Sequence, residues 1–196
     1  MLNTAELTGE RVAAIQRADQ LSRRWKQRPT CMVADYKPFQ VLDGAGLRCS
    51  LYVSYCPFNC MGCYNKAAQK ANYGTALNAE LTEQILTDVG RPHVAGLTFV
   101  GGEPMLSARH LVPIARRVHD VGKTVWTYTG YRFEVLRELT DERRLLLELT
   151  DVLVDGQFIA ELRDDTNPPA FRGSVNQRLV DVAASLGRGS IIRAAS

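Results

Sequence analysis

Three cysteines stand close together in the stretch SYCPFNCMGCYNK, residues 54–66. Cys56, Cys60 and Cys63 are separated by three and then by two residues. Structural zinc sites take four ligands, usually as two cysteine pairs or one pair with histidines, and this stretch contains no histidine. Thiolates also bind copper and iron–sulfur clusters. Three thiolates on a four-iron cluster leave one iron open, and an open iron can bind a substrate or a second cofactor.

A second chemically suggestive stretch is FVGGEPM, residues 99–105. Gly101 and Gly102 allow a ligand to approach the backbone closely, because neither residue has a side chain. Glu103 and Pro104 stiffen the turn, and we expect backbone carbonyls and the carboxylate to face outward. Carbonyl and carboxylate oxygens suit an ammonium group. On its own, this stretch also fits an ordinary turn at the end of a strand.

Size and composition indicate one globular domain without a membrane span. The chain has 196 residues, of which 45% are hydrophobic, and no stretch approaches the roughly 18 apolar residues of a membrane-spanning helix. The N-terminal sequence is polar and lacks the apolar core of a secretory signal, so we expect a cytoplasmic protein with reduced thiols. Five cysteines, three of them in one short stretch, do not suit a disulfide framework.

The first 30 residues differ from the rest of the chain in charge. They carry six basic and three acidic side chains, whereas residues 31–196 carry 18 of each. Apolar residues recur on one helical face up to Pro29, which predicts an amphipathic helix. We interpret residues 1–30 as a helical extension packed on a domain formed by residues 31–196, with its basic side in solvent. The alternative is that the basic side binds an acidic partner or nucleic acid.

The elements that must position the two chemical stretches alternate between strands and helices. Short apolar or β-branched stretches predict strands, and the longer stretches between them predict the crossover helices of a parallel sheet. The expected strands are residues 47–55, 96–101, 123–128 and 151–156, with a lead-in strand at 32–41. The expected helices are residues 79–89, 108–121 and 133–149, the last with a break at Thr140.

We expect these units to form an incomplete (βα) barrel. A complete barrel of eight units needs about 200 to 250 residues, which is more than residues 31–196 provide. Ligands bind at the carboxyl ends of the strands in such sheets. The cysteine stretch and the double-glycine stretch each follow an expected strand directly, so both should lie at this edge of the sheet.

The longer phrase DGAGLRCSLYVSYCPFNCMGCYN, residues 43–65, resembles the signature of the radical S-adenosylmethionine (SAM) enzymes, and within them of the glycyl-radical-enzyme activases. In that superfamily three cysteines hold a 4Fe-4S cluster whose fourth iron binds the amino and carboxylate groups of SAM. The phrase departs from the activase pattern at Ala45, Tyr52 and Tyr55, where proline, phenylalanine and glycine are usual. Gly62 stands where most of the superfamily has an aromatic residue.

Three further stretches resemble one group of activases. WTYTGYRFEVL (126–136), TDVLVDGQF (150–158) and FRGSVNQR (171–178) are similar, in this order, to segments of the anaerobic ribonucleoside-triphosphate reductase-activating proteins. The resemblance covers about residues 36–186. It implies an oxidoreductase with an α/β fold, an incomplete (βα) barrel of radical-SAM type with an added N-terminal helix.

The resemblance also implies the chemistry. A reduced cluster passes one electron to SAM, the bond to the ribose 5′ carbon breaks, and methionine and a 5′-deoxyadenosyl radical form. The radical takes a hydrogen atom from a backbone glycine in the large subunit of the reductase, so the substrate is a protein. A low-potential donor such as flavodoxin is expected to reduce the cluster, and neither a membrane nor nucleic acid is expected as a partner.

Particular residues receive roles from the same resemblance, although no catalytic side chain is assigned. The predicted cluster ligands are Cys56, Cys60 and Cys63. Gly102 is the preferred contact to the SAM amino group, and Tyr64 is expected near the adenine. The full set of predicted SAM contacts is Gly62, Cys63, Tyr64, Gly101, Gly102, Glu103, Thr127, Tyr128 and Thr129. The predicted contacts to the reductase are Asp155, Arg172, Ser174 and Asn176.

Two alternatives stay open at the level of the sequence. One is another small radical SAM enzyme that acts on a small molecule, such as a deazaguanine-forming cyclase, which would not require the segment at residues 171–178. The other is a non-catalytic iron–sulfur or metal-binding module that senses redox state, or that binds nucleic acid through the basic helix. Cleavage of SAM would exclude the module, and a requirement for a partner protein would exclude the cyclase.

Overall fold

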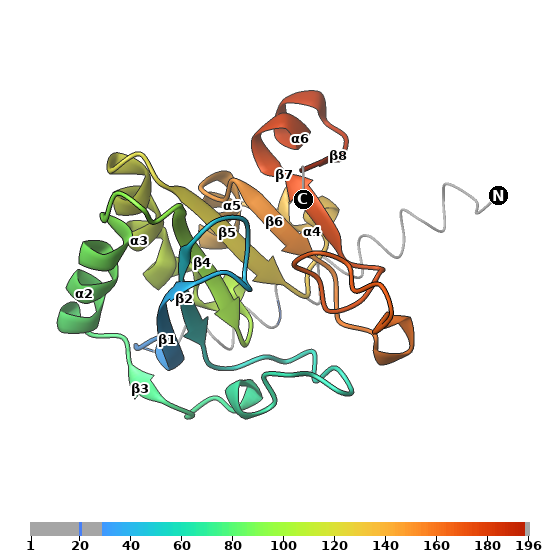
Figure 1. The fold of residues 1–196 in the computed structure, drawn as a ribbon, viewed down its shortest axis with the longest axis horizontal. Helices are drawn as coiled ribbons and strands as arrows, with labels where there is room; N and C mark the ends of the chain where they lie inside the picture. Colours follow the sequence, from blue (N-terminus) through green and yellow to red (C-terminus); the bar gives the residue numbers. More distant parts are fainter. Residues whose placement is uncertain (1–19, 21–28, 195–196) are drawn as a thin grey trace.

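A computed structural model describes residue 20 and residues 29–194 of the chain. The described residues form one eight-stranded sheet in the order β3-β1-β2-β4-β5-β6-β7-β8 (Figure 1). The strands are β1 (Met32–Gln40), β2 (Arg48–Val53), β3 (Thr75–Ala76), β4 (Gly96–Gly101), β5 (Thr124–Thr129), β6 (Val152–Asp155), β7 (Arg178–Asp181) and β8 (Ile192–Arg193). The helices are α2 (Ala79–Val89), α3 (Ala108–Asp120), α4 (Phe133–Leu136), α5 (Glu142–Glu148) and α6 (Val182–Arg188), with short 3-10 turns η1 (Ala67–Gln69), η2 (Pro104–Ser107) and η3 (Ala160–Leu162).

The centre of the sheet is parallel, as predicted. β2, β4, β5 and β6 pair in parallel and are joined by α2, by α3, and by α4 with α5. β1 runs antiparallel to β2 at one side, and β7 runs antiparallel to β6 at the other. The sheet is therefore open, and the predicted α/β class with an incomplete set of (βα) units is confirmed.

The predicted helix at residues 133–149 is divided into α4 and α5, which confirms the expected break. Asp141 begins α5, because its side chain accepts a hydrogen bond from the backbone N–H of Arg143. The predicted N-terminal helix lies outside the described residues, apart from Gln20 and residues 29–30, so its boundary stays a prediction. Within the part of the chain that the structure describes, no helix has both the length and the apolar character needed to cross a membrane.

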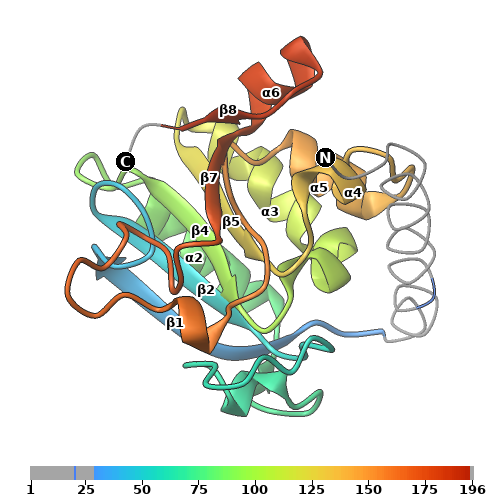
Figure 2. The ribbon, with the colours of Figure 1, turned by 90° about the vertical axis from the view of Figure 1, so that its right-hand side faces the viewer.

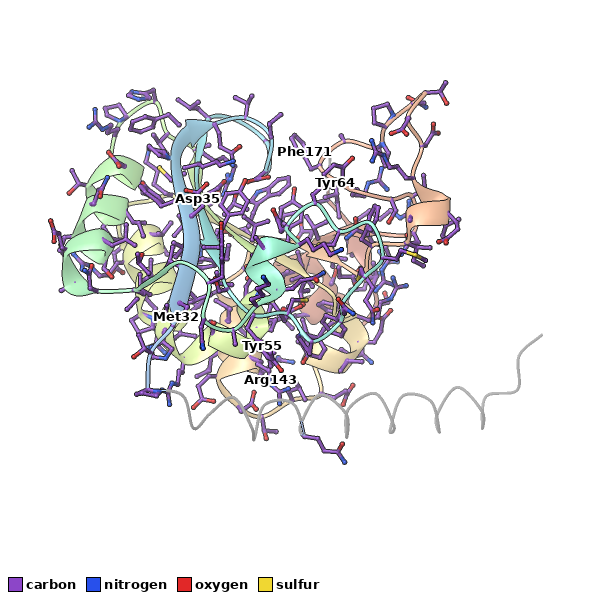
Figure 3. All side chains as sticks on the ribbon, turned by 90° about the horizontal axis from the view of Figure 1, so that it is seen from below. Met32, Asp35, Tyr55, Tyr64, Arg143 and Phe171 are labelled. Atoms are coloured by element: carbon purple, nitrogen blue, oxygen red, sulfur yellow. The ribbon has the colours of Figure 1, made fainter. Side chains whose placement is uncertain are left out.

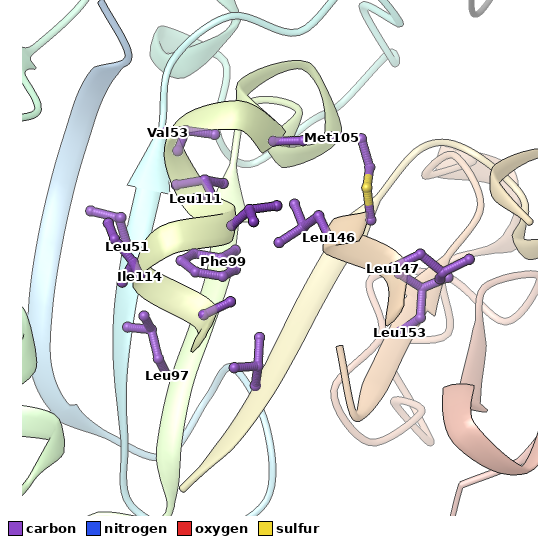
Figure 4. Packing of buried hydrophobic residues seen from close by; sticks show 14 of the residues in the cluster. Leu51, Val53, Leu97, Phe99, Met105, Leu111, Ile114, Leu146, Leu147 and Leu153 are labelled. Carbon is purple, nitrogen blue, oxygen red and sulfur yellow. The ribbon is translucent and has the colours of Figure 1, made fainter. Parts of the chain in front are cut away.

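The central strands present two different faces because side chains alternate along a strand. Leu51, Phe99 and Val125 point toward the helices and belong to the main hydrophobic core. Figure 4 shows Leu51 and Phe99 packed against Leu111 and Ile114 of α3. In Figure 2, α3, α4 and α5 lie on this side of the strands.

The opposite face of the sheet carries a buried cation beside an aromatic ring. Arg48 is buried, its Nε donates to Thr98 Oγ1 at 2.9 Å, and its Nη2 donates to the carbonyls of Leu97 and Thr124, both at 2.9 Å. The guanidinium also lies 5.4 Å from the ring of Trp126. Burial lowers the pKa of Arg48 to about 10, so it stays charged at neutral pH. The single side chain thus links β2, β4 and β5 at their amino ends.

We predict that Arg48→Met lowers the free energy of unfolding by about 3 kcal/mol, because it leaves two buried carbonyls and a threonine hydroxyl without their donor. Urea unfolding followed by circular dichroism measures this change. Arg117→Met is the matched control, since Arg117 makes an exposed ion pair with Glu83 on the surface of the helical layer, and it should change stability little. Equal effects of the two substitutions would contradict the structural role of Arg48.

Candidate functional site

The three clustered cysteines line one small cavity at the carboxyl ends of the parallel strands. Cys56, Cys60 and Cys63 lie on the loop between β2 and η1 and, with residues that follow β4, β5 and β6, surround about 130 Å³, which we call the inner cavity. Cys31 and Cys49 are instead buried in the main hydrophobic core, as expected for Cys49. All five thiols are free of disulfide bonds.

The cysteine loop is fixed at its start by backbone hydrogen bonds. The N–H of Ser54 donates to the carbonyl of Met32 at 2.8 Å, and the N–H of Tyr55 donates to the carbonyl of Ala68 at 2.7 Å. Within the loop, Gly62 has a φ of +73°, a conformation that glycine adopts without strain. This backbone places the three cysteines around one cavity.

The chemistry of the thiols fits a bound iron–sulfur cluster. Burial raises the pKa of Cys56 to about 12 and also raises the pKa of Cys60, so these thiols are protonated unless a metal replaces the proton. Among the described residues, no three His, Cys, Asp or Glu side chains converge closely enough to hold one metal ion. A four-iron cluster holds its thiolates farther apart than one ion does, because each thiolate binds a different iron. Three thiols around a small cavity suit such a cluster.

The double-glycine turn after β4 packs directly on the cysteine loop. The N–H of Gly102 donates to the carbonyl of Val53 at 2.6 Å, and the N–H of Glu103 donates to the carbonyl of Tyr55 at 2.7 Å. A Cβ added at Gly102 would lie 2.8 Å from the carbonyl carbon of Tyr55 and 3.0 Å from the carbonyl oxygen of Ala68. Glycine at this position therefore lets the turn approach the cysteine loop closely. The missing side chain would also let a ligand approach the turn.

Glu103 differs from its expected orientation, since its carboxylate is buried rather than facing outward. Its Oε1 accepts from the N–H of Met105 at 3.0 Å and from Thr129 Oγ1 at 2.8 Å, and its Oε2 accepts from the N–H of Gly130 at 2.8 Å. Burial raises the pKa of Glu103 to about 7, and the three donors lower it against this effect. Glu103 lines the inner cavity while it ties the end of β4 to the end of β5.

Of the three β5 residues that are predicted to contact SAM, two line the inner cavity. Tyr128 lines the inner cavity, and its hydroxyl donates to the carbonyl of Phe171 at 2.8 Å. Thr129 also lines this cavity. Thr127 is fully buried on the helix-facing side, where its hydroxyl lies 2.8 Å from that of Thr150. The prediction of a ligand contact is therefore wrong for the Thr127 side chain, because alternation along the strand turns it away from Tyr128.

The predicted reductase contacts mostly have structural roles. Asp155 is fully buried, accepts from the N–H of Phe133 at 2.8 Å, and pairs with Arg178. Ser174 is also fully buried, and its hydroxyl donates to Asn176 Oδ1 at 2.7 Å. These two side chains cannot face an incoming partner, so their predicted contacts are wrong.

Asn176 and Arg172, the other two predicted reductase contacts, are only partly buried. The side chain of Asn176 donates to the carbonyl of Gln157 at 2.9 Å, which ties the segment at 171–178 to the turn after β6. Arg172 lines a larger cavity of about 600 Å³, the outer cavity, on the open face of the sheet. Arg172 remains a candidate contact to a partner.

The outer cavity adjoins the inner one. Tyr64, a predicted SAM contact, lines it on one side, and Phe171 lines it from the loop between β6 and β7 (Figure 3). Residues shared by the walls of both cavities are Cys63, Asn65, Val100, Tyr128, Phe158 and Gln177. A ligand in one cavity can therefore contact a ligand in the other.

Sequence reasoning missed several residues of the outer cavity. Asp43 lines the wall, and its carboxylate accepts from the Tyr52 hydroxyl at 2.6 Å. Both residues belong to the signature phrase at residues 43–65, so the sequence contained a signal for their role. Lys37 and Phe158 also line the cavity, but neither stands in a distinctive pattern in the sequence. Their positions depend on how loops far apart in the chain fold together.

The comparisons with known proteins agree with this geometry. The family model for a 4Fe-4S single cluster domain matches residues 42–180, which include all three clustered cysteines. The anaerobic ribonucleoside-triphosphate reductase-activating protein of Salmonella typhi is 36% identical over 150 residues, which cover 72% of this chain and 93% of that protein. This chain belongs to that family of activating proteins. The family predicted from the sequence motifs is therefore confirmed.

Other relatives share the same coverage. The activating protein of Escherichia coli (strain K12) is 34% identical over 149 residues, covering 72% of this chain and 93% of its own length. The protein of the same description from Enterobacteria phage T4 is 31% identical over 147 residues, covering 72% of this chain and 88% of its own. Among solved structures, QueE from Escherichia coli matches with a TM-score of 0.42 and 13% identity, over 68% of this chain and 74% of that chain.

We predict that Gly102→Ala lowers the free energy of unfolding by about 2 kcal/mol and reduces the iron bound per chain, because the added methyl group displaces the cysteine loop. Thermal unfolding and iron analysis after anaerobic reconstitution measure the two effects. Gly187→Ala is the control, since an added Cβ there meets nothing within 4 Å. Full iron content in Gly102→Ala with loss of SAM binding alone would show that the glycine serves only the ligand.

Tyr55 provides a second prediction, because it has a φ of +79° at the position where the activase pattern has glycine. A side chain in this region costs about 1 kcal/mol or more. Tyr55→Gly should therefore be more stable than Tyr55→Ala by about 1 kcal/mol, since both lose the ring but only alanine keeps the strain. Denaturant unfolding compares the pair directly, and equal stability would argue against backbone strain at this residue.

Proposed function

We propose that this protein activates an anaerobic ribonucleoside-triphosphate reductase through reductive cleavage of SAM and formation of a glycyl radical on the large subunit of the reductase. Membership of the activating-protein family over 72% of the chain carries the proposal. The three thiols, the double-glycine turn and Tyr128 lie around a cavity that adjoins the larger outer cavity, which agrees with a cluster held by the thiols beside SAM that extends toward Tyr64.

The residues of the inner cavity would divide the binding of the two cofactors. Cys56, Cys60 and Cys63 would hold a 4Fe-4S cluster, and the backbone at Gly101 and Gly102 would hold SAM beside it. When bound and reduced, these cofactors supply a 5′-deoxyadenosyl radical that takes one hydrogen atom from the substrate. Glu103 keeps the turn in place, because its carboxylate accepts three hydrogen bonds.

The outer cavity supports a protein segment as the substrate. Its volume of about 600 Å³ adjoins the inner cavity along shared walls, so a chain segment in the outer cavity would reach the atoms held in the inner one. Glycine suits the transfer, because its α-carbon has no side chain that would keep it away from the reacting carbon. Arg172, which lines the outer cavity, would contact this segment.

The proposed function also includes an electron donor for the cluster and a compartment that keeps the thiols reduced. A low-potential donor such as flavodoxin would reduce the cluster, and the cytoplasm would keep the thiols reduced for metal binding. Residues 1–30 would form an extension that is not needed for SAM cleavage, because every chemical motif lies downstream of them.

We predict that the reconstituted protein, incubated without oxygen with SAM, a low-potential reductant and its cognate reductase, produces a stable glycyl radical on the reductase. The electron paramagnetic resonance spectrum should show a doublet from the one remaining α-hydrogen, and deuterated glycine should collapse this doublet. Cleavage of SAM without any such signal would favour a radical SAM enzyme that acts on a small molecule.

Two cysteine variants are the controls for this experiment. Cys60→Ala should lose the cluster and the radical, because it removes one of only three protein ligands. Cys49→Ala should keep both, since Cys49 lies in the hydrophobic core. Iron and sulfide retained at full content in Cys60→Ala would overturn the assignment of the ligands.

A further inference from the structure

The segment at residues 171–178 holds the turn that follows β6. This turn comprises residues 156–159, and we call it the β6 turn. The Ser174 hydroxyl accepts a hydrogen bond from the N–H of Ile159, the last residue of the turn, at 3.2 Å. The side chain of Gln177 donates to the first carbonyl of the turn at 2.9 Å. The segment therefore fixes both ends of the β6 turn through hydrogen bonds to its backbone.

One peptide group in the middle of the β6 turn has partners on both sides. Its carbonyl, that of Gln157, accepts from Asn176 Nδ2 at 2.9 Å. Asn176 Oδ1 in turn accepts from the Ser174 hydroxyl at 2.7 Å. The N–H of the same peptide group, that of Phe158, faces the Cys60 thiol: burial raises the pKa of this thiol, and the N–H lowers it against that effect. The donors therefore point in one direction, from Ser174 toward the sulfur of a predicted cluster ligand.

The ring of Phe158 packs on the cysteine loop beside this N–H. A Cβ added at Gly62 would lie 3.4 Å from the ring, and the ring centroid lies 6.3 Å from that of Tyr64 in an edge-on arrangement. Gly62 and Tyr64 stand on either side of Cys63. Phe158 and Cys60 also line the inner cavity together. The β6 turn thus contacts the cysteine loop through a ring as well as through its backbone.

A hydrogen bond to a cluster thiolate changes how readily the cluster accepts an electron. Reduction adds negative charge to a cluster and its sulfurs, so an N–H that faces a sulfur stabilises the reduced form more than the oxidised form. The N–H therefore raises the reduction potential. Consecutive hydrogen bonds strengthen the last donor, because each bond polarises the next one.

We propose that Ser174 and Asn176 hold the central peptide group of the β6 turn so that its N–H donates to the Cys60 sulfur and raises the reduction potential of the bound cluster. The two side chains are positioning residues, since they act on the sulfur through the β6 turn rather than by direct contact. This inference rests on the proposed function, because it takes the group held by the three cysteines to be a 4Fe-4S cluster. It gives the segment at residues 171–178 a role in the redox step that needs no contact with the reductase.

The test measures the midpoint potential of the reconstituted protein by anaerobic redox titration, followed by electron paramagnetic resonance of the reduced cluster. Replacing Phe158 by its α-hydroxy analogue, phenyllactic acid, keeps the ring but turns the N–H into an ester oxygen, so the potential should shift to a more negative value. Asn176→Ala and Ser174→Ala should each shift it in the same direction by less, because each removes one member of the chain of donors. Val175→Ala is the matched control, since Val175 is 49% exposed in the same segment, and the potential should stay unchanged.

Combining two changes distinguishes one connected chain from separate effects. With the ester at position 158 in place, Asn176→Ala should add no further shift, because the link that it weakens is already lost. An ester variant that holds a full cluster at the potential of the unaltered protein would overturn the contact to the sulfur. A shift in the ester variant, with Asn176→Ala and Ser174→Ala at the unaltered potential, would overturn the positioning role of these two residues.

The same measurements separate this inference from the proposed function, since none of them needs the reductase. Unchanged potentials in a protein that still forms the glycyl radical would overturn the inference and leave the function intact. A reconstituted protein that holds no 4Fe-4S cluster would overturn both.

Discussion

Close backbone packing between two loops determines where the whole site lies. The turn after β4 and the cysteine loop after β2 meet through two hydrogen bonds, and Gly102 is the residue that allows them to come so close. The parallel pairing of β2 with β4 brings both loops to one edge of the sheet, but it does not by itself fix their separation. Glu103 extends the same arrangement to β5 through Thr129 and Gly130. The thiols and the expected SAM-binding backbone are thus joined by direct backbone contacts.

The two faces of the sheet have different roles. One face packs against the helices in the hydrophobic core, and the other face lines the outer cavity. Hydrophobic residues of β2, β4 and β5 pack under the helices and form the main core together with apolar residues of the helices themselves. The other face carries Arg48, Tyr52 and Tyr128 beside a smaller hydrophobic cluster of Trp126, Val154 and Leu179. Arg48 donates hydrogen bonds to carbonyl and hydroxyl groups of β4 and β5 on this face. The open face can therefore form a cavity without a second layer of helices above it.

Much of this arrangement could be predicted from the sequence, because the central strands are apolar stretches and each motif directly follows one of them. The positions of β2, β4, β5 and β6 agree with the predicted ranges within a few residues. Side-chain direction was harder to predict. Thr127 and Tyr128 are neighbours in one motif, yet the alternation of the strand puts them on opposite faces. Asp155 has the residue type of a partner contact, but the distant Arg178 draws it into the interior.

Other side chains gave no sign in the sequence of the cavity that they line, even within a recognised motif. Phe171, for example, reaches the outer cavity because its ring packs on Trp126 and its carbonyl accepts from Tyr128. Both contacts join segments more than 40 residues apart in the chain. β7 and β8 were likewise missed, since both are short and lie at or near the edge of the sheet, where the hydrophobic pattern is weak.

The shared wall of the two cavities has a consequence for the order of events in one catalytic cycle. A chain segment that fills the outer cavity separates the inner cavity from solvent on that side. Under the proposed function, SAM that enters through the outer cavity binds before the reductase docks, and methionine leaves by this route after the reductase departs. The docked segment would also shield the reactive species from solvent on that side.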